Sequence, residues 1–116
     1  MRYLMLVCTD PTADPYVREE DTIEEWVAEN DRLGRRVIGE RLRPAAESRV
    51  VRVRQGGTLV TEGPFAELGE QIAGFDILDC ADLDEAVAVA SRHPMARFGL
   101  LELREFWEFE GDGAAS

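Results

Sequence analysis

Two strand–helix–strand units, separated by a short hairpin pattern, are the feature of this sequence that most constrains its fold. Apolar runs and helical spacings alternate along the chain, and turn residues separate them. The expected elements are, in order, a strand at 3–8, a helix from Asp21 or Thr22 to Leu33, a strand at 37–42, a hairpin at 50–54 and 58–61, a strand at 75–80, a helix from Asp82 to before Pro94, and a strand at 100–109.

Without the hairpin, this order is the β-α-β-β-α-β plan of ferredoxin-like sandwiches. We therefore predict an α+β fold, a ferredoxin-like sandwich with an inserted β-hairpin. The length of 116 residues is typical of one domain, which we place at residues 1–110. The small and polar residues 111–116 are expected to form a flexible tail.

Capping and stop signals define both predicted helices. Thr22 with Glu25 three residues later forms the pattern of a capping box, and Gly34 is a typical C-terminal stop. Asp82 should cap the second helix, with Glu85 at its third position. Trp26 lies on the apolar side of the first helix, which indicates a core position rather than a stacking platform.

The hairpin alternates apolar and basic residues. Val51 and Val53 are expected to point inward, and Arg52 and Arg54 outward. A tight turn at Gly56-Gly57 would join its two strands.

One face of the predicted sheet would carry both helices, while the other face has no cover within the chain. Several strands nevertheless look apolar on both sides, and an uncovered apolar face marks an interface. We therefore expect a homodimer with the two sheets face to face, in which Trp107 and Phe109 could extend the contact. Cys8 and Cys80 both end strands expected to be parallel neighbours, so their thiols could lie close together.

Composition excludes several classes of function. The formal net charge is −11, whereas a protein that binds nucleic acid directly needs a basic surface. No apolar run approaches the ~20 residues that span a bilayer. Two cysteines and one histidine are too few for a disulfide framework or a structural zinc site, and no cofactor or metal is indicated. We expect a cytoplasmic protein with reduced thiols.

The stretch from Glu62 to Glu67 combines a stiff backbone with ionisable groups. Gly63 permits a positive φ or a close backbone approach, Pro64 fixes φ, and Phe65 can anchor the loop by burying a large apolar surface. One interpretation is a rigid turn that leads into the next strand. The other is a ligand-binding loop, in which Glu62 and Glu67 face the ligand and Glu62 serves as a general base.

His93 and Arg41 are further candidates for a functional site. His93 is the one side chain here that ordinarily titrates near neutral pH, so it could act in catalysis with Asp79 or Asp76 as its orienting partner. Alternatively, His93 caps the helix that ends beside it or lies on the surface. Arg41 could bind an anionic ligand or pair with one of the 24 acidic residues.

Several segments together resemble the YCII-related family, in its DGPF subgroup. The matching residues are Glu62-Gly63-Pro64-Phe65-Ala66-Glu67 with Glu70, Gly74 and Phe75, then Gly39–Pro44, Asp82–Ala86 and Arg92-His93-Pro94. The resemblance implies a dimeric α/β-barrel of ferredoxin-like units. Some members of the subgroup are associated with extracytoplasmic-function sigma factors. More distant relatives are small enzymes that use a His–Asp pair, and one group removes chloride from a chlorinated hydroxyquinol.

Three functions are compatible with these expectations, and one of them is that of a purely structural dimer domain. The first is a protein that binds or transforms a small molecule in a pocket beside the Glu62–Phe65 loop. The second is a regulatory or interaction module that acts with a sigma factor and without catalysis.

Overall fold

A computed structural model describes residues 1–63 and 70–108 of the chain. Its elements are β1 (Arg2–Cys8), a 3₁₀ turn (Arg18–Glu20), α1 (Ile23–Arg32), β2 (Arg36–Arg41), a second 3₁₀ turn (Ala45–Glu47), β3 (Arg49–Arg54), β4 (Gly57–Glu62), β5 (Ile72–Asp79), α2 (Leu83–Ser91), α3 (Met95–Phe98) and β6 (Leu100–Glu105). None of the described helices is long and apolar enough to cross a membrane.

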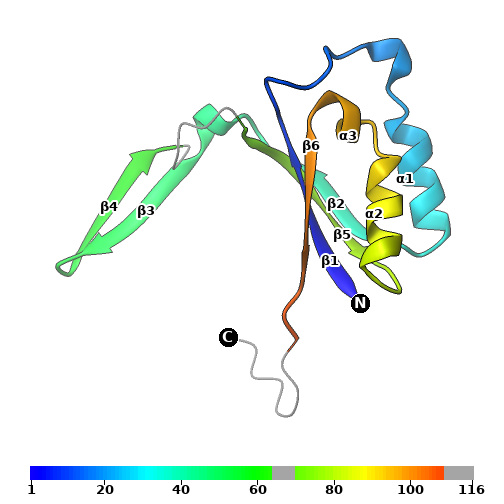
Figure 1. Ribbon diagram of the computed structural model, residues 1–116. Coiled ribbons are helices and arrows are strands. Elements are labelled where there is room, and N and C mark those ends of the chain that lie inside the picture. The colour runs from blue at the N-terminus through cyan, green and yellow to red at the C-terminus, as the bar shows by residue number, and fades with distance from the viewer. Residues whose placement is uncertain (64–69, 109–116) are drawn as a thin grey trace.

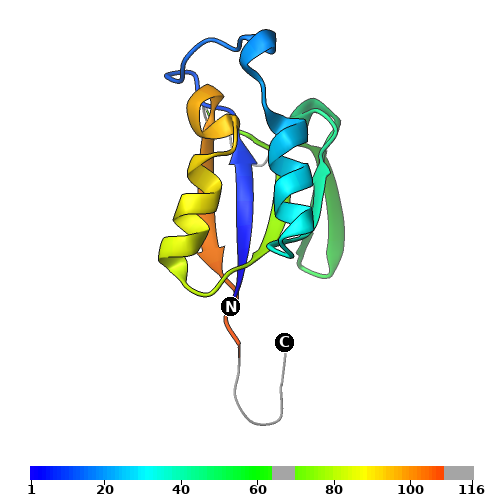
Figure 2. The same ribbon diagram turned by 90° about the vertical axis from the view of Figure 1, so that its right-hand side faces the viewer.

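Four strands form an antiparallel sheet in the order β2-β5-β1-β6. The two long helices, α1 and α2, lie side by side on one face of this sheet (Figures 1 and 2). This α+β architecture is compatible with the predicted ferredoxin-like plan. Strands β3 and β4 form a separate two-stranded sheet on the opposite side from the helices (Figure 1).

The hydrophobic core lies between the helices and the sheet. Tyr3, Met5 and Leu78 are fully buried there because alternate residues of β1 and β5 point toward the helices. Trp26 of α1 is also buried, and its indole Nε1 donates a hydrogen bond to the carbonyl oxygen of Val89 in α2 at 2.9 Å. The prediction that Trp26 belongs to the core is thus confirmed, and its hydrogen bond joins the two helices.

The first helix is capped differently from the sequence prediction. Thr22 holds the N-cap position but makes no side-chain capping bond, because Asp21 Oδ1 accepts from the backbone N–H of Ile23 at 3.0 Å instead. At the C-terminal end, Gly34 has a φ of 72°, as its role as a stop signal requires. The second helix follows the prediction: Asp82 Oδ1 accepts from the N–H of Glu85 at 2.9 Å.

This difference makes a testable prediction about the start of α1. Asp21→Ala should destabilise the fold by about 1 kcal/mol, the usual cost of losing a side-chain cap. Thr22→Ala should cost less than about 0.5 kcal/mol, as for other surface changes. Urea unfolding of both variants measures the two costs, and an equal cost would show that Thr22 shares the capping role.

The hairpin departs from the prediction in its turn and in its side-chain directions. Its two-residue turn is Gln55-Gly56 rather than Gly56-Gly57, since both residues have positive φ (51° and 77°), as a type I′ turn requires. Val51 and Val53 do not point into a core. They are 63% and 61% exposed because β3 pairs with β4 alone and nothing in the described chain covers this face.

The expected proximity of the two cysteines is wrong. Strands β1 and β5 are neighbours, but they run antiparallel. Each cysteine lies at the C-terminal end of its strand, so the two thiols lie at opposite ends of this strand pair. Cys8 pairs with Ile72 at the start of β5, whereas the backbone N–H of Cys80 bonds to the carbonyl of Met1. Both thiols are free and buried.

The last strand is shorter than the sequence indicated. Strand β6 ends at Glu105, and Trp107 beyond it is 83% exposed. Phe109 lies outside the described residues. The alternating pattern continues past Glu105, and the backbone N–H of Phe106 still bonds to the carbonyl oxygen of Arg2 at 3.0 Å, but Arg2 is the first residue of β1 and the ladder ends there.

Candidate functional site

The main cavity lies beside α1, where the ends of β2 and β5 meet the segment that joins α2 to α3. Its volume is about 630 Å³, the size of ordinary small-molecule sites. Its lining residues are Val7, Tyr16, Asp21, Ile23, Val27, Arg36, Gly39, Glu40, Arg41, Ala73, Gly74, Phe75, Asp76, His93, Pro94 and Met95. Two of the residues expected to form a site from the sequence, His93 and Arg41, are among them.

His93 is buried in the wall of this cavity, with 5% of its surface exposed. Its Nδ1 accepts a hydrogen bond from the backbone N–H of Met95 at 3.0 Å, and its ring stacks edge-on against Trp26 with 4.7 Å between centroids. An Nδ1 that accepts a hydrogen bond carries no proton, so the neutral ring holds its proton on Nε2. His93 therefore does not lie on the surface, and it does not cap α2 as a positively charged imidazolium.

Burial controls the charge state of His93. It lowers the pKa of His93 from 6.5 to about 4, although the negative charge of Asp21 opposes this shift. The imidazole is consequently neutral at physiological pH and presents Nε2–H as a hydrogen-bond donor. No described residue accepts a hydrogen bond from Nε2. Since no fully buried side-chain nitrogen of the described residues lacks a partner, Nε2 is not fully buried. The donor is thus available to a molecule in the cavity.

Tyr16 and Asp21 form a rim next to His93. The Tyr16 hydroxyl donates to Asp21 Oδ2, while Asp21 Oδ1 accepts from the N–H of Ile23 at 3.0 Å. Tyr16 also packs edge-on against Phe98 of α3, with ring centroids 5.2 Å apart. Both oxygens of Asp21 are therefore engaged, and the contacts hold the segment before α1 against α3.

Asp76 and Arg36 form a buried ion pair in the sheet wall of the cavity. Arg36 Nε donates to Asp76 Oδ1 at 2.8 Å, and Arg36 Nη1 reaches Asp31 at 3.1 Å. The Asp76 side chain is 9% exposed and that of Arg36 is 18% exposed. Burial raises the pKa of Asp76 above its usual range, and Arg36 limits this rise by stabilising the carboxylate.

Gly39 makes room for this ion pair. It lies opposite Asp76 in the β2–β5 ladder, and a Cβ at Gly39 would collide with Asp76 Oδ1 and would stand 2.7 Å from Arg36 Nη2. Arg36 Nη2 also donates to the carbonyl oxygen of Gly39 at 3.2 Å. The glycine thus lets the charged groups of neighbouring strands approach on the helix side of the sheet.

Arg41 lies at the end of the edge strand β2, opposite Gly74. It lines the cavity and is exposed. None of the ion pairs within residues 1–63 and 70–108 involves Arg41, whereas nearby Arg43 is paired with Glu47 at 3.0 Å. Since Arg36 is neutralised by two carboxylates, Arg41 is the cation of the lining that can meet an anionic group of a ligand.

The loop candidates do not contribute to the cavity as far as the structure describes them. Glu62 is exposed at the end of β4, opposite Arg49 in the hairpin. Gly63 donates its N–H to the carbonyl of Ser48 at 3.0 Å, and a Cβ there would collide with the Ser48 hydroxyl. This close approach fits the turn interpretation. Pro64, Phe65 and Glu67 lie outside the described residues.

Of the two acids proposed as partners of His93, only Asp76 shares its cavity. Asp79 precedes α2 and His93 follows it, so the helix separates them, and Asp79 instead meets the N-terminal amine at 3.4 Å. The charge that acts on His93 is that of Asp21, which the sequence marked only as a helix start. Nothing in the sequence distinguished Arg36 from the other arginines, because its role depends on the pairing of β2 with β5.

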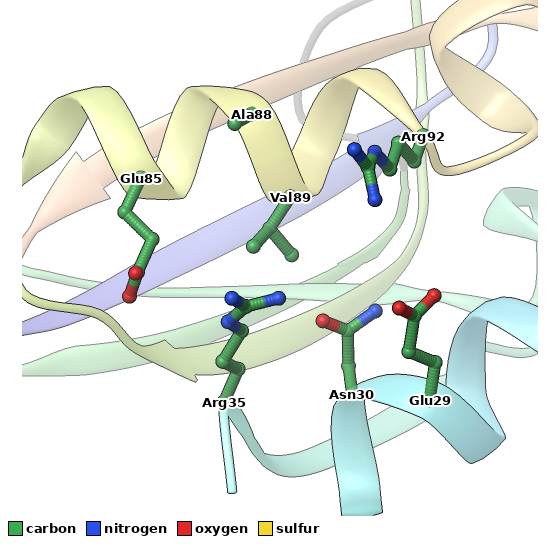
Figure 3. Close-up of a pocket in the computed structure, with 7 residues that line it drawn as sticks. All are labelled: Glu29, Asn30, Arg35, Glu85, Ala88, Val89 and Arg92. Carbon is green, nitrogen blue, oxygen red and sulfur yellow. The ribbon is translucent and has the colours of Figure 1, made fainter. Parts of the chain in front are cut away.

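A second, smaller cavity of about 100 Å³ lies between α1 and α2 (Figure 3). Arg35 and Glu85 face each other across it, as do Glu29 and Arg92, with buried Asn30 between the two pairs. The amide of Asn30 donates to the carbonyl of Trp26 at 2.8 Å. This cleft has room for a few water molecules, so the larger cavity is the candidate functional site.

Comparison with known proteins identifies the family. Residues 1–110 match the YCII-related domain. The chain belongs to the YCII-related family. It is also 48% identical over 50 residues to the uncharacterized protein R00369 of Rhizobium meliloti (strain 1021), a match that covers 43% of this chain and 40% of that protein. The matched part thus spans less than half of the curated relative. Family membership agrees with the resemblance found in the sequence, and neither name states a reaction.

Proposed function

We propose that this YCII-related protein binds a small anionic molecule in the cavity lined by His93, Asp76 and Arg41. The observation that carries this proposal is the presence of two buried titratable groups, His93 and Asp76, in the wall of one cavity of about 630 Å³. Buried polar groups with altered pKa values that share a cavity are a general mark of functional sites. The apolar residues around them, such as Val27 and Met95, suit a ring or short carbon chain.

Each polar group has a distinct task in this proposal. Arg41 binds an anionic substituent of the ligand, and His93 Nε2–H donates a hydrogen bond to a carbonyl or phenolic oxygen. Asp76, held as a carboxylate by Arg36, is the base. In the reaction class that fits best, a C–H bond next to a carbonyl breaks. The proton moves to Asp76, and the electron pair moves to the carbonyl oxygen, where the His93 donor stabilises the enolate.

Binding is tested with a panel of aromatic hydroxy acids and cyclic keto acids in thermal-shift and calorimetric titrations. A compound that binds should lose at least ~10-fold in affinity with Arg41→Ala, because a charge-assisted contact contributes about 1.5–3 kcal/mol. Arg43→Ala is the matched control, since Arg43 is an exposed arginine two residues along the chain that does not line the cavity. Equal losses in both variants would place the ligand elsewhere.

Proton abstraction is tested with any ligand found in this way. Exchange of its acidic C–H for deuterium in D₂O, followed by NMR, should be accelerated by the natural protein. His93→Asn should slow the exchange by about 10²-fold, the usual effect of one oxyanion donor. If a ligand binds but its C–H does not exchange, the protein binds the molecule without abstracting a proton from it. Absence of binding by the whole panel would favour the regulatory alternative, which the net charge of −11 supports by suiting a basic protein partner.

The finer family assignment is part of the same proposal. The segment Glu62–Glu67 supports membership of the DGPF subgroup, and with it an association with a sigma factor as the alternative function. The uncovered face of the sheet supports the homodimer.

A further inference from the structure

Residues 10–21, here called the strap, lead from β1 toward α1 and pass beside α3 (Figures 1 and 2). Two residues of the strap, Tyr16 and Asp21, line the cavity of about 630 Å³. The segment that leads into α3 lines the same cavity with His93, Pro94 and Met95. The strap and the start of α3 therefore form one part of the cavity wall together.

The hydrophobic core does not hold the strap in this position. None of the residues 10–21 is buried. Apart from the bonds to Arg97, the hydrogen bonds of the strap within the described chain join groups at most five positions apart. Segments with few buried contacts open locally at a low cost in free energy. The position of the strap thus depends on a small number of contacts with α3.

Arg97 of α3 makes the ionic contacts with the strap. Its Nε donates to Asp14 Oδ2 at 3.0 Å, and its Nη1 donates to Glu20 Oε1 at 2.8 Å. These two acids lie on either side of Tyr16 in the sequence. Because a guanidinium presents several donors in a fixed plane, one arginine can bind two carboxylates at once. Arg97 therefore ties the strap to α3 at two points.

The ring of Phe98 supports the same contact. Phe98 is 8% exposed, and Tyr16 packs edge-on against it with ring centroids 5.2 Å apart. The guanidinium carbon of Arg97 lies 4.9 Å from the centre of this ring. Arg97 does not itself line the cavity. Any effect of Arg97 on the cavity therefore acts through the strap, whose Tyr16 hydroxyl donates to Asp21 at the rim beside His93.

Charge favours release of the strap when Arg97 lets go. Residues 10–21 contain five acids and one arginine, so the strap has a formal charge of −4. Like charges repel, and Arg97 offsets two of these acids. The side chains of Arg97, Asp14 and Glu20 are 49%, 62% and 50% exposed. Ion pairs this exposed are weak and are screened by salt, so they hold the strap in place but release it often.

We propose that Arg97 is the positioning residue of a gate: its two ion pairs hold the strap against α3, and their release opens the cavity beside His93. This inference rests on the proposed function for its purpose, since a gate regulates the entry of a ligand. The movement itself is measurable without a ligand, because it changes how closely solvent approaches the His93 ring.

The first test measures solvent access to His93, the single histidine of the sequence. A neutral, soluble gadolinium chelate broadens the NMR signals of protons that it approaches. Arg97→Ala should raise the open population by roughly 10-fold, because two exposed ion pairs together contribute about that factor. The broadening of the His93 ring signals should then increase by at least ~3-fold. Arg97→Lys should restore part of the protection, since lysine lacks the planar fork.

Arg104→Ala is the matched control. Arg104 of β6 is also an exposed, ion-paired arginine, with Glu102 at 2.8 Å, but it does not line the cavity or contact the strap. This variant should change the broadening by less than ~2-fold. Urea unfolding of each variant checks that the fold remains intact.

Salt distinguishes an ionic clamp from simple packing. Raising the salt concentration from about 50 mM to about 500 mM screens exposed ion pairs. The broadening at His93 should therefore increase with salt in the natural protein. It should not increase in Arg97→Ala, where neither ion pair remains to be screened.

Ligand kinetics tests the gate itself, with any compound of the panel that binds. In Arg97→Ala, the rate constants of association and dissociation should both rise by roughly 10-fold, because the ligand enters and leaves through the open state. The dissociation constant should change by less than ~3-fold, since Arg41, His93 and Asp76 are untouched. Arg41→Ala should instead raise the dissociation constant.

The outcomes separate this inference from the proposed function. Unchanged access to His93 in Arg97→Ala would overturn the strap, as would an equal effect of Arg104→Ala or a salt response that persists without Arg97. If access responds as expected but no compound binds, the strap stands and the proposed function fails. If a compound binds and Arg97→Ala leaves both rate constants unchanged, the gate fails and the binding site stands.

Discussion

Replacing Gly39 with alanine should destabilise the fold by about 3–5 kcal/mol, the cost of disrupting a buried ion pair. The new Cβ would collide with Asp76 Oδ1 and crowd Arg36 Nη2, which stands 2.7 Å from its position. The pair cannot move easily, because the Asp76 side chain is 9% exposed and Arg36 also bonds to Asp31 and to the carbonyl of Gly39. Urea unfolding monitored by circular dichroism measures the loss.

Gly57→Ala is the matched control. Gly57 is also a strand glycine without a positive φ, and the nearest atom to its Cβ would be the Arg54 carbonyl oxygen at 3.6 Å, an ordinary contact. We expect a change of at most about 1 kcal/mol in either direction there, because the effect of alanine on the unfolded chain offsets any small loss in the folded one. A loss in the control as large as in Gly39→Ala would show that strand glycines in general, and not the ion pair, explain the effect.

A double-mutant cycle separates the collision from other effects. In a background with Asp76→Ala, the carboxylate that blocks the Cβ is gone, so Gly39→Ala should cost at least about 2 kcal/mol less than in the natural protein. If the losses of unfolding free energy from the two substitutions were simply additive, the collision with Asp76 would not be the reason that position 39 requires glycine. The result bears on function as well, because Asp76 is the base in the proposed reaction.

The order of elements and the single-sided helix layer could be predicted because they depend on local patterns. Gly34 and Asp82 end and begin helices through their own backbone or side chain, and Trp26 lies in the core because of helical spacing. The capping residue of α1 was misplaced by one position, since Asp21 and Thr22 both carry a suitable oxygen and only the local backbone selects one.

Predictions that needed neighbouring strands were less accurate. The direction of β5 relative to β1 decided where Cys8 and Cys80 lie, and the assumed parallel direction was wrong. Alternation correctly grouped Val51 with Val53, but alternation states only that two residues share a face. Whether that face is covered depends on what lies beside the hairpin, and in the described chain nothing does.

The candidate site could be predicted in part, residue by residue. The chemistry of the imidazole alone predicts His93, and Asp76 is one of the two acids that the sequence predicts as its partner. The cavity that unites them could not be foreseen, because it joins β2, β5, α1 and the segment after α2. The contribution of Arg36 depends on strand pairing across 40 residues of sequence. The sequence predicts a site at the Glu62–Glu67 stretch because its acids lie close together along the chain, but Glu62 lies on the exposed hairpin.

NMR titration of His93 should show a pKa of about 4 in the folded protein. The signal is unambiguous because the chain contains one histidine. Burial disfavours the charged ring, and Asp21 only partly offsets this effect. Nitrogen chemical shifts should also show the proton on Nε2, since Nδ1 accepts from the N–H of Met95. A pKa near 6.5 or a proton on Nδ1 would contradict both the buried site and the donor role of His93.

The low pKa makes His93 a source of acid sensitivity. Above pH 6.5 the ring is neutral in both the folded and the unfolded chain, so stability is complete there. Between pH 6.5 and about 4 the unfolded chain binds a proton that the folded chain does not, and stability falls. The total loss is on the order of 3 kcal/mol, given about 1.4 kcal/mol for each pH unit. His93→Asn can keep an acceptor for the Met95 N–H but does not titrate. Its free energy of unfolding should therefore fall less steeply over this interval, and parallel curves for the two proteins would contradict the assignment.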